Sequence, residues 1–225
     1  FKGTPKVPDG QFSLIIKKLG GNDNAFTTHD YTAFYQNITR GSLERMMEME
    51  ADRMKNLSLT EDEVTSERQV IIEERRQRID NEPQAKFQEQ LMSALFVNHP
   101  YGTPVIGWLH EMKQLTREDA LESYNKWYAP NNAVLVVSGD ITAAELKPLA
   151  EKYYGGIEPS MLPIRKRPMA APLVAQHRII LEDPRVGPPT ITKVYRAPRG
   201  SEALEMMTEI FGGSSTARIY KDLVV

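Results

Sequence analysis

Helix start signals recur at wide intervals along this chain, and they constrain its fold more than any other feature. A Thr followed three residues later by an acidic residue stands at Thr60, Thr116 and Thr142. In this pattern the Thr oxygen accepts a hydrogen bond from a backbone N–H of the first helical turn, and the acidic side chain accepts one from the Thr backbone N–H. The signals predict helices over residues 60–81, 116–128 and 142–154.

Further helices and several strands are predicted between these signals. The additional helices cover residues 12–19, 43–57, 84–96 and 201–213, and a last one begins near 214. Thr, Tyr and Phe favour strands, and they are frequent in residues 24–38, where His29 and Asp30 indicate a turn between two strands. Residues 133–141, 177–183 and 190–197 also have strand-like composition. Because strands and helices interleave, the pattern indicates an α/β or α+β sandwich of sheet and helices.

The composition excludes several classes of function. The chain has 225 residues, 40% of them hydrophobic, which suits a globular fold with a sizeable core. The 28 basic and 30 acidic residues leave a net charge of -2, so nothing indicates binding to nucleic acid or to an acidic membrane surface. Apolar runs such as 133–137 are too short to span a bilayer. The chain has no Cys, which excludes disulfides, thiolate nucleophiles and Cys-ligated metal.

The helix predicted over residues 60–81 carries the strongest candidate for chemistry. Glu67 and Glu74 lie two turns apart on one face, and Val70 and Ile71 lie between them. Carboxylates on a partly apolar face favour a bound cation, a hydrogen-bond donor or a proton. The alternative is an ordinary helix surface with Glu–Arg pairs, such as Glu74 with Arg78 at i,i+4.

The remaining motifs do not indicate a further catalytic or metal-binding site. The histidines are His29, His99, His110 and His177, and none stands in a His-x-x-x-His or His-x-x-Glu-His pair. A structural or surface role is expected for each. The sequence contains no nucleophile elbow, no phosphate-binding loop and no dinucleotide fingerprint. The four residues "HPYG" are expected to shape a loop and to pack Tyr101.

A set of phrases in a fixed order resembles the pitrilysin/insulinase-like zinc metallopeptidases, and most of all their processing-peptidase-type branch. The phrases are "FKGT", "LGGNDNAFTTHDYTAFY", "ADRM", "ERQVIIEE", "HPYGTPVIG", "YAPNNAVLVVSGDI" and "FGGSSTARIYKDL". They cover nearly the whole chain. The resemblance implies an α+β fold with a mixed, largely antiparallel sheet packed against helices, as in one half of such a peptidase.

The resemblance also assigns site residues. In this family the inverted motif His-x-x-Glu-His provides two zinc ligands and the general base, and it comes just before the Phe-Lys-Gly-Thr phrase. We therefore expect this motif upstream of Phe1 and no general base within the chain. The family's third zinc ligand matches Glu74, and a supporting carboxylate seven residues earlier matches Glu67. A carboxylate completes a two-His zinc site and leaves a fourth position for water.

The resemblance further implies a substrate-binding edge strand and a partner half. In the family an extended peptide adds to the strand that corresponds to Asn24, Ala25, Phe26 and Thr27. The alternative is that Asn24 and Ala25 only support the preceding Gly-rich turn. We expect residues 1–198 to be the zinc-peptidase half without its first strand and motif helix. Residues 199–225 are expected to lead towards a second homologous half.

The resulting hypothesis is a fragment of a zinc-dependent metalloendopeptidase that acts on peptides or unfolded proteins. The fragment is expected to be inactive and zinc-free alone and to pair with a second half or partner subunit, with a dimer as one possible assembly. One alternative is a catalytically dead partner or scaffold subunit of a pitrilysin-like heterodimer, although retention of Glu67 and Glu74 argues against it. A peptide-binding module without hydrolysis is the other. The expected location is the bacterial periplasm, with the cytoplasm as alternative.

Overall fold

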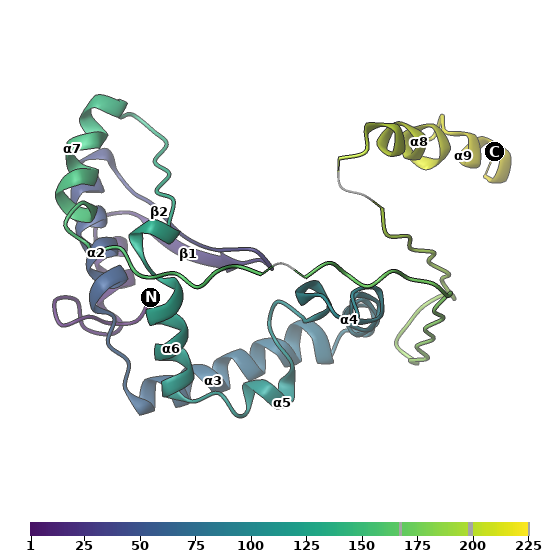
Figure 1. Cartoon of the computed structure of the whole chain (residues 1–225), viewed down its shortest axis with the longest axis horizontal. Helices are drawn as coiled ribbons and strands as arrows, with labels where there is room; N and C mark the ends of the chain where they lie inside the picture. Colours follow the sequence, from purple (N-terminus) through teal and green to yellow (C-terminus); the bar gives the residue numbers. More distant parts are fainter. Residues whose placement is uncertain (167, 198–199, 225) are drawn as a thin grey trace. The chain divides into compact units, whose positions relative to one another are not determined.

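The computed structural model describes residues 1–166, 168–197 and 200–224 in two compact units, Phe1–Asp183 and Pro184–Val225 (Figure 1). In the first unit the described helices and strands are α1 (Gln11–Lys18), β1 (Asn22–Thr27), β2 (Thr32–Asn37), α2 (Leu43–Asn56), α3 (Glu61–Arg75), α4 (Pro83–Leu95), α5 (Leu109–Met112), α6 (Arg117–Trp127) and α7 (Ala143–Tyr154). The second unit contains α8 (Glu202–Gly212) and α9 (Arg218–Leu223). The boundary expected between residues 198 and 199 lies outside the described residues.

The core of the first unit forms around its opening segment, α1 and α2. The buried residues of this cluster are Val7, Phe12, Ile16, Met46 and Met49. Phe1 packs on it, with its ring stacked on that of Phe12 at a centroid distance of 4.9 Å. Thr4 is buried and donates a hydrogen bond to the buried carboxylate of Asp52 on α2. The opening segment is thereby part of the core.

Strands β1 and β2 form the predicted antiparallel hairpin, in which Ala25 pairs with Phe34 and Thr27 with Thr32. Ser13 on α1 donates a 2.6 Å hydrogen bond to Asp23 of β1. On the same side of the sheet, the guanidinium of Arg53 on α2 lies 3.9 Å from the ring centroid of Phe34. One face of the hairpin is therefore attached to α1 and α2.

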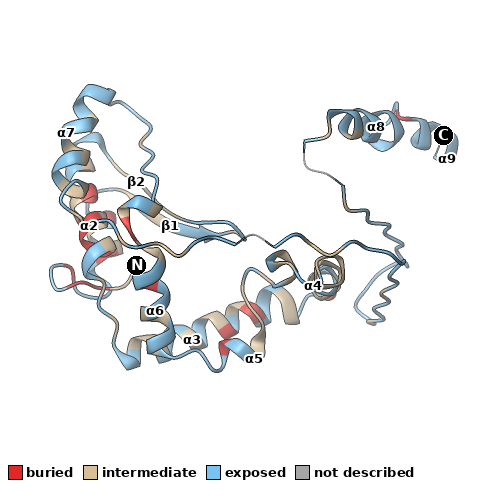
Figure 2. Ribbon diagram, in the orientation of Figure 1, coloured by how far each residue is buried: buried red, intermediate tan, exposed pale blue. Residues whose placement is uncertain are grey.

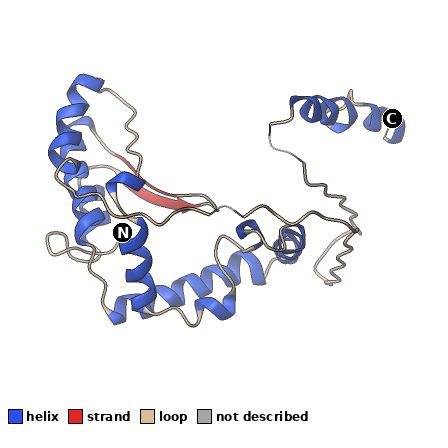
Figure 3. Cartoon of the chain, in the orientation of Figure 1, coloured by secondary structure: helices blue, strands red, loops and turns tan. Residues whose placement is uncertain are grey.

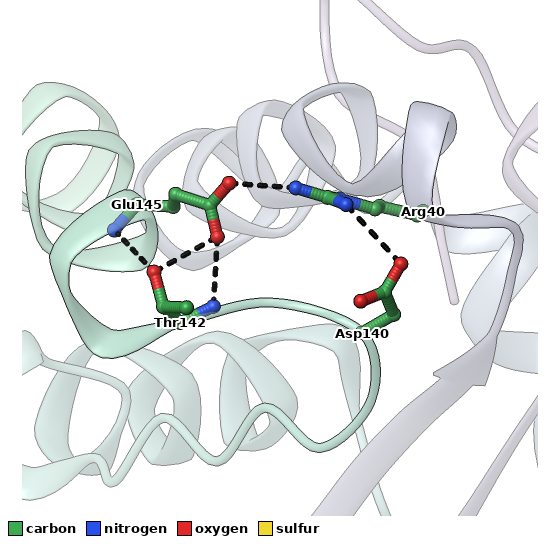
Figure 4. A network of polar contacts seen from close by, with 4 residues as sticks. All are labelled: Arg40, Asp140, Thr142 and Glu145. Atoms are coloured by element: carbon green, nitrogen blue, oxygen red, sulfur yellow. Dashed lines mark hydrogen bonds and ion pairs between the residues drawn. The ribbon is translucent and has the colours of Figure 1, made fainter.

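All of the predicted capping boxes are present. Thr60, Thr116 and Thr142 each accept a hydrogen bond from the backbone N–H three residues later, and the acidic side chain at that position accepts one in return. At α7, the box joins a wider network (Figure 4): Glu145 also accepts a 2.6 Å hydrogen bond from Arg40, whose other terminal nitrogen lies 3.1 Å from Asp140. This network attaches the start of α7 to the segment that precedes α2.

The α+β class is confirmed, but three strand predictions are wrong. Among the described residues the only sheet is the β1–β2 hairpin, and residues 133–141, 177–183 and 190–197 run as unpaired chain (Figure 3). Val134 and Val136 are 88% and 81% exposed, so the first of these ranges, 133–141, is not buried either (Figure 2). Strand-like composition produces a strand only where a neighbouring strand supplies hydrogen bonds. No such neighbour occurs in the described part of the chain.

In the second unit, Ser201 caps the start of α8, because its backbone carbonyl and hydroxyl accept hydrogen bonds from the N–H of Leu204. The helices predicted over 201–213 and from 214 are present as α8 and α9. None of the helices within the described residues combines the length and the apolar character that a bilayer crossing requires.

Candidate functional site

Helix α3 presents both predicted carboxylates, Glu67 and Glu74, on one side. The capping box at Thr60 fixes where the helix begins, and the unbroken α-helical backbone then sets Glu67 and Glu74 two turns apart. Their side chains are 48% and 40% exposed. Both carboxylates are therefore accessible and not enclosed in a core.

Glu67 is held by the opening segment of the chain. Lys2 Nζ lies 2.9 Å from Glu67 Oε1 and 3.5 Å from Asp9 Oδ2. Partial burial lowers the pKa of Lys2, but the hydrogen bonds and charges of Glu67 and Asp9 outweigh it, so this pKa lies above its ordinary value. The pair keeps the "FKGT" segment against the same side of α3 that carries Glu67. The sequence prediction did not name Lys2 as its partner.

Glu74 takes part in the Glu–Arg pair that the sequence offered as the alternative interpretation. Arg78 Nη1 lies 3.1 Å from Glu74 Oε1, whereas the neighbouring Glu73 pairs with Arg76 at 3.1 Å. An open surface strip along α3 and the turn after it surrounds Glu74 and is lined by Ser66, Gln69, Val70, Glu73, Glu74 and Gln77. The Val70 side chain in this strip is 56% exposed. Among the described residues, the pair with the exposed Arg78 is the only ion pair of Glu74 that a cation would have to displace.

The end of α3 contains a buried arginine that the sequence prediction missed. After Arg75 the backbone widens into a π-helical turn, Arg76–Asp80, before α4 begins. Arg75 is 5% exposed, and both of its terminal nitrogens donate to Glu89 of α4, at 2.8 and 2.9 Å. These hydrogen bonds raise the pKa of Arg75 above its ordinary value. The sequence did contain a signal for this burial. Arg75 stands three residues after Ile72, so both lie on the face of α3 that is buried.

The four predicted substrate-binding residues form most of β1, which pairs on one side only within the described residues. The turn bond from Thr28 N–H to the Tyr31 carbonyl, 2.8 Å, sets the alternation of the ladder. Hydrogen-bonded and non-hydrogen-bonded pairs alternate from Thr28–Tyr31 along the register, so the pair Ala25–Phe34 is a non-hydrogen-bonded one. The Ala25 N–H therefore points away from β2. That N–H donates instead to Asn24 Oδ1 at 2.8 Å. Phe26 is 48% exposed, and Thr27 contacts Thr32 through their hydroxyls at 3.1 Å.

The hairpin tip is attached to the "HPYG" loop, as expected for a loop-shaping role. Tyr101 donates a 2.7 Å hydrogen bond to Asp30, and His29 Nε2 lies 3.1 Å from the Thr103 carbonyl oxygen. His99 accepts a 3.1 Å hydrogen bond from the Tyr101 N–H. These histidines thus have structural partners, and the contacts fix the end of the hairpin.

The described residues contain no complete metal-binding cluster. Across residues 1–166, 168–197 and 200–224, no three His, Cys, Asp or Glu side chains gather closely enough to hold an ion. Glu74 supplies an accessible carboxylate oxygen, which is a suitable zinc donor, and it fits the role of one ligand in a larger set.

Comparisons with known proteins agree on one family of peptidases. The model described as "Insulinase (Peptidase family M16)" matches residues 1–108, and the model "Peptidase M16 inactive domain" matches residues 114–225. The zinc protease PqqE of Helicobacter pylori is 33% identical over 158 residues, which cover 70% of this chain and 36% of that protein. A probable mitochondrial-processing peptidase subunit beta of Schizosaccharomyces pombe is 30% identical over 160 residues, 71% of this chain and 35% of that protein.

Solved structures give the same result. The crystal structure of a protease from Helicobacter pylori superposes with a TM-score of 0.69 and 32% sequence identity, and covers 76% of this chain and 41% of that one. The chain spans between 35% and 52% of the length of the first curated relatives that it matches.

Proposed function

This chain belongs to the pitrilysin/insulinase-like peptidase family M16, and we propose that it forms most of the zinc-binding half of a zinc-dependent metalloendopeptidase. The parent protein hydrolyses peptide bonds in small proteins or unfolded segments. One contact carries this proposal: Lys2, in the phrase that follows the family's His-x-x-Glu-His motif, pairs with Glu67 at 2.9 Å. This ion pair attaches the opening segment to helix α3, and it supports the proposal that the upstream motif and the glutamates belong to one site.

Glu74 is the proposed third zinc ligand, and Glu67 is the proposed supporting carboxylate. The Glu74 side chain is 40% exposed, and within the described part of the chain its one ion-pair partner is the exposed Arg78, which leaves the carboxylate free to turn towards a cation. Glu67 supports the site through Lys2, by holding the opening segment in place. When bound, zinc supplies Lewis acidity that lowers the pKa of a water molecule.

Strand β1 is the proposed peptide-binding edge. On its outer edge the Ala25 N–H has one acceptor among the residues that the structure describes, the neighbouring Asn24 side chain at 2.8 Å. An extended peptide can replace such a local bond with main-chain hydrogen bonds. Phe26 and Thr27 then lie at the positions where peptide side chains would pass.

Alone, the chain is proposed to be zinc-free and inactive, because one carboxylate ligand does not hold zinc. The parent would complete the site with the upstream motif and with a second homologous half or partner subunit. The periplasm remains our proposed location, and cell fractionation of the parent organism with an antibody to this chain tests it.

The experiment is a peptidase assay on the full-length parent with an unfolded, fluorogenic peptide. Glu74→Ala is expected to lower kcat/KM at least a hundredfold, while Glu73→Ala, the same change one residue earlier on the exposed surface, leaves it within threefold. Equal activity in wild type and Glu74→Ala would overturn the proposal. A parent without any activity, in which Glu74→Ala also leaves the zinc content unchanged, would support the dead-subunit alternative.

A second test addresses the edge strand. Ala25→Pro removes only the outward N–H and leaves the inward ladder of β1 intact. We expect KM to rise about tenfold or more with a smaller change in kcat. An unchanged KM would remove Ala25 from the peptide-binding edge.

A further inference from the structure

Arg75 connects three segments at the end of the helix that carries Glu74. Its Nη1 and Nη2 donate to the two carboxylate oxygens of Glu89 on α4, at 2.8 and 2.9 Å, and Nη1 also donates to the Gly107 carbonyl at 2.9 Å. Its Nε lies 3.6 Å from Asp80 Oδ1, at the end of the π-helical turn. We call this set of contacts the Arg75 clamp.

The clamp is almost closed to solvent. The side chains of Arg75 and Glu89 are only 6% and 9% exposed, which is far less than the other ion pairs of α3. A fork-shaped guanidinium bound by both oxygens of one carboxylate has a single favourable geometry. The clamp therefore fixes the direction in which the last α-helical turn of α3 ends.

Glu74 is the residue directly before Arg75, and the π-helical turn Arg76–Asp80 begins directly after Arg75. A π-helical turn interrupts the regular hydrogen-bond ladder, so the end of α3 depends on tertiary contacts to keep its orientation. Arg76, the next residue, has a 59% exposed side chain, and its one ion pair within the described residues is with Glu73 of the same helical segment.

We infer that Arg75 is a positioning residue for Glu74, because its clamp to Glu89 and Gly107 holds the helix end from which the Glu74 carboxylate projects. This inference rests on the proposed role of Glu74 as a zinc ligand. Residues that orient a metal ligand typically change metal affinity by about 10- to 100-fold when they are replaced.

The first experiment uses this chain itself and does not depend on zinc. Hydrogen exchange of the amides of residues 72–80 is compared in wild type, Arg75→Lys and the matched surface variant Arg76→Lys. Arg75→Lys keeps the charge and loses the fork, so exchange is expected to accelerate about tenfold or more. Arg76→Lys is expected to match wild type. Equal protection of these amides in wild type and both variants would overturn the proposal that the Arg75 clamp holds the helix end.

The second experiment uses the full-length parent. Zinc affinity is measured by chelator competition, and the visible spectrum of the Co²⁺-substituted protein reports ligand geometry. Arg75→Lys should weaken zinc binding about tenfold and change the Co²⁺ spectrum, whereas Arg76→Lys changes neither. The double variant Arg75→Met/Glu89→Leu replaces the buried pair by apolar groups and is expected to restore thermal stability without restoring the spectrum.

The outcomes separate the two proposals. Wild-type zinc affinity and spectrum in Arg75→Lys, with weakened binding in Glu74→Gln, would overturn the positioning role and leave the proposed ligand intact. Unchanged zinc affinity in Glu74→Gln would overturn the proposed function, whatever the exchange data show for the clamp. Recovery of both stability and spectrum in the double variant would show that Arg75 is merely structural.

Discussion

Lys2 and Glu67 form an ion pair with 2.9 Å between Nζ and Oε1, although one stands in the opening segment and the other in the middle of α3. The pair brings together two phrases whose order in the sequence gave no indication of contact. Because Lys2 follows Phe1, which is stacked on the core residue Phe12, the opening segment has a fixed path along α3.

Replacement of Lys2 by Met should weaken this attachment. The pKa of Lys2 is raised in the folded chain, so its contribution is fully present below the ordinary value of 10.5 and declines as pH rises beyond it. We expect Lys2→Met to lower the free energy of unfolding by about 0.5 to 1 kcal/mol near neutral pH. Urea unfolding at neutral pH and above about pH 11 measures this, with the exposed Lys6→Met as control. A stability difference between wild type and Lys2→Met that grows with alkaline pH would contradict a stabilising Lys2–Glu67 ion pair.

Thr4 anchors the same segment through the buried carboxylate of Asp52. Thr4→Val keeps the shape of the side chain, removes the hydroxyl donor to Asp52 and leaves the Val7 N–H without its 3.0 Å acceptor. We expect a loss of about 2 kcal/mol in the free energy of unfolding, because buried polar groups lose their partners. The exposed Thr65→Val, measured in the same urea titration, should cost less than about 0.5 kcal/mol. Equal effects at both positions would refute a buried bond at Thr4.

The helices were predictable because their signals are local. Each capping box fixes a start through atoms within one turn, and Gly20, with φ +76°, closes α1 in a conformation that favours glycine. The hairpin was predictable for the same reason, since its turn and its strands are adjacent in sequence. The family was recognisable because its phrases keep their order along nearly the whole chain.

Contacts between distant segments were not predictable. The strand-like run at Val134 and Val136 has the right composition but no partner within the described residues, and composition does not specify pairing. Lys2 and Arg75 were missed because a charged side chain shows its partner only after folding. The spacing of Glu67 and Glu74 placed them on one side of α3 correctly, and their roles stay predictions.

The hairpin tip should loosen when the Tyr101 hydroxyl is removed. Tyr101→Phe eliminates the 2.7 Å hydrogen bond to Asp30 and keeps the ring contacts with His29 and His99. We expect faster hydrogen exchange at residues 28–31 and a stability loss of about 1 kcal/mol or less. Tyr31→Phe is the matched control, because within the described part of the chain the Tyr31 hydroxyl forms no hydrogen bond. Identical exchange in both variants would contradict the role of Tyr101.

The start of α7 should be sensitive to acid. The backbone and side-chain hydrogen bonds of Thr142, together with Arg40, lower the pKa of Glu145 below its ordinary value of 4.5 (Figure 4). Its contribution to stability is therefore present above pH 4.5 and is lost as pH falls through the lower folded pKa. Glu145→Ala should be less stable than wild type at neutral pH, and the two should converge in acid. Thermal unfolding of both proteins across pH checks this, and a stability difference that persists undiminished in acid would contradict it.

Zinc content of the full-length parent tests the central claim most directly. We would purify wild type, Glu74→Ala and Glu73→Ala under one protocol and measure zinc per protein by mass spectrometry of the metal, with circular dichroism to verify folding. We expect about one zinc per wild-type and Glu73→Ala molecule, and a loss of most of it from Glu74→Ala. Full zinc occupancy in a folded Glu74→Ala protein would contradict the assignment of Glu74 as a ligand.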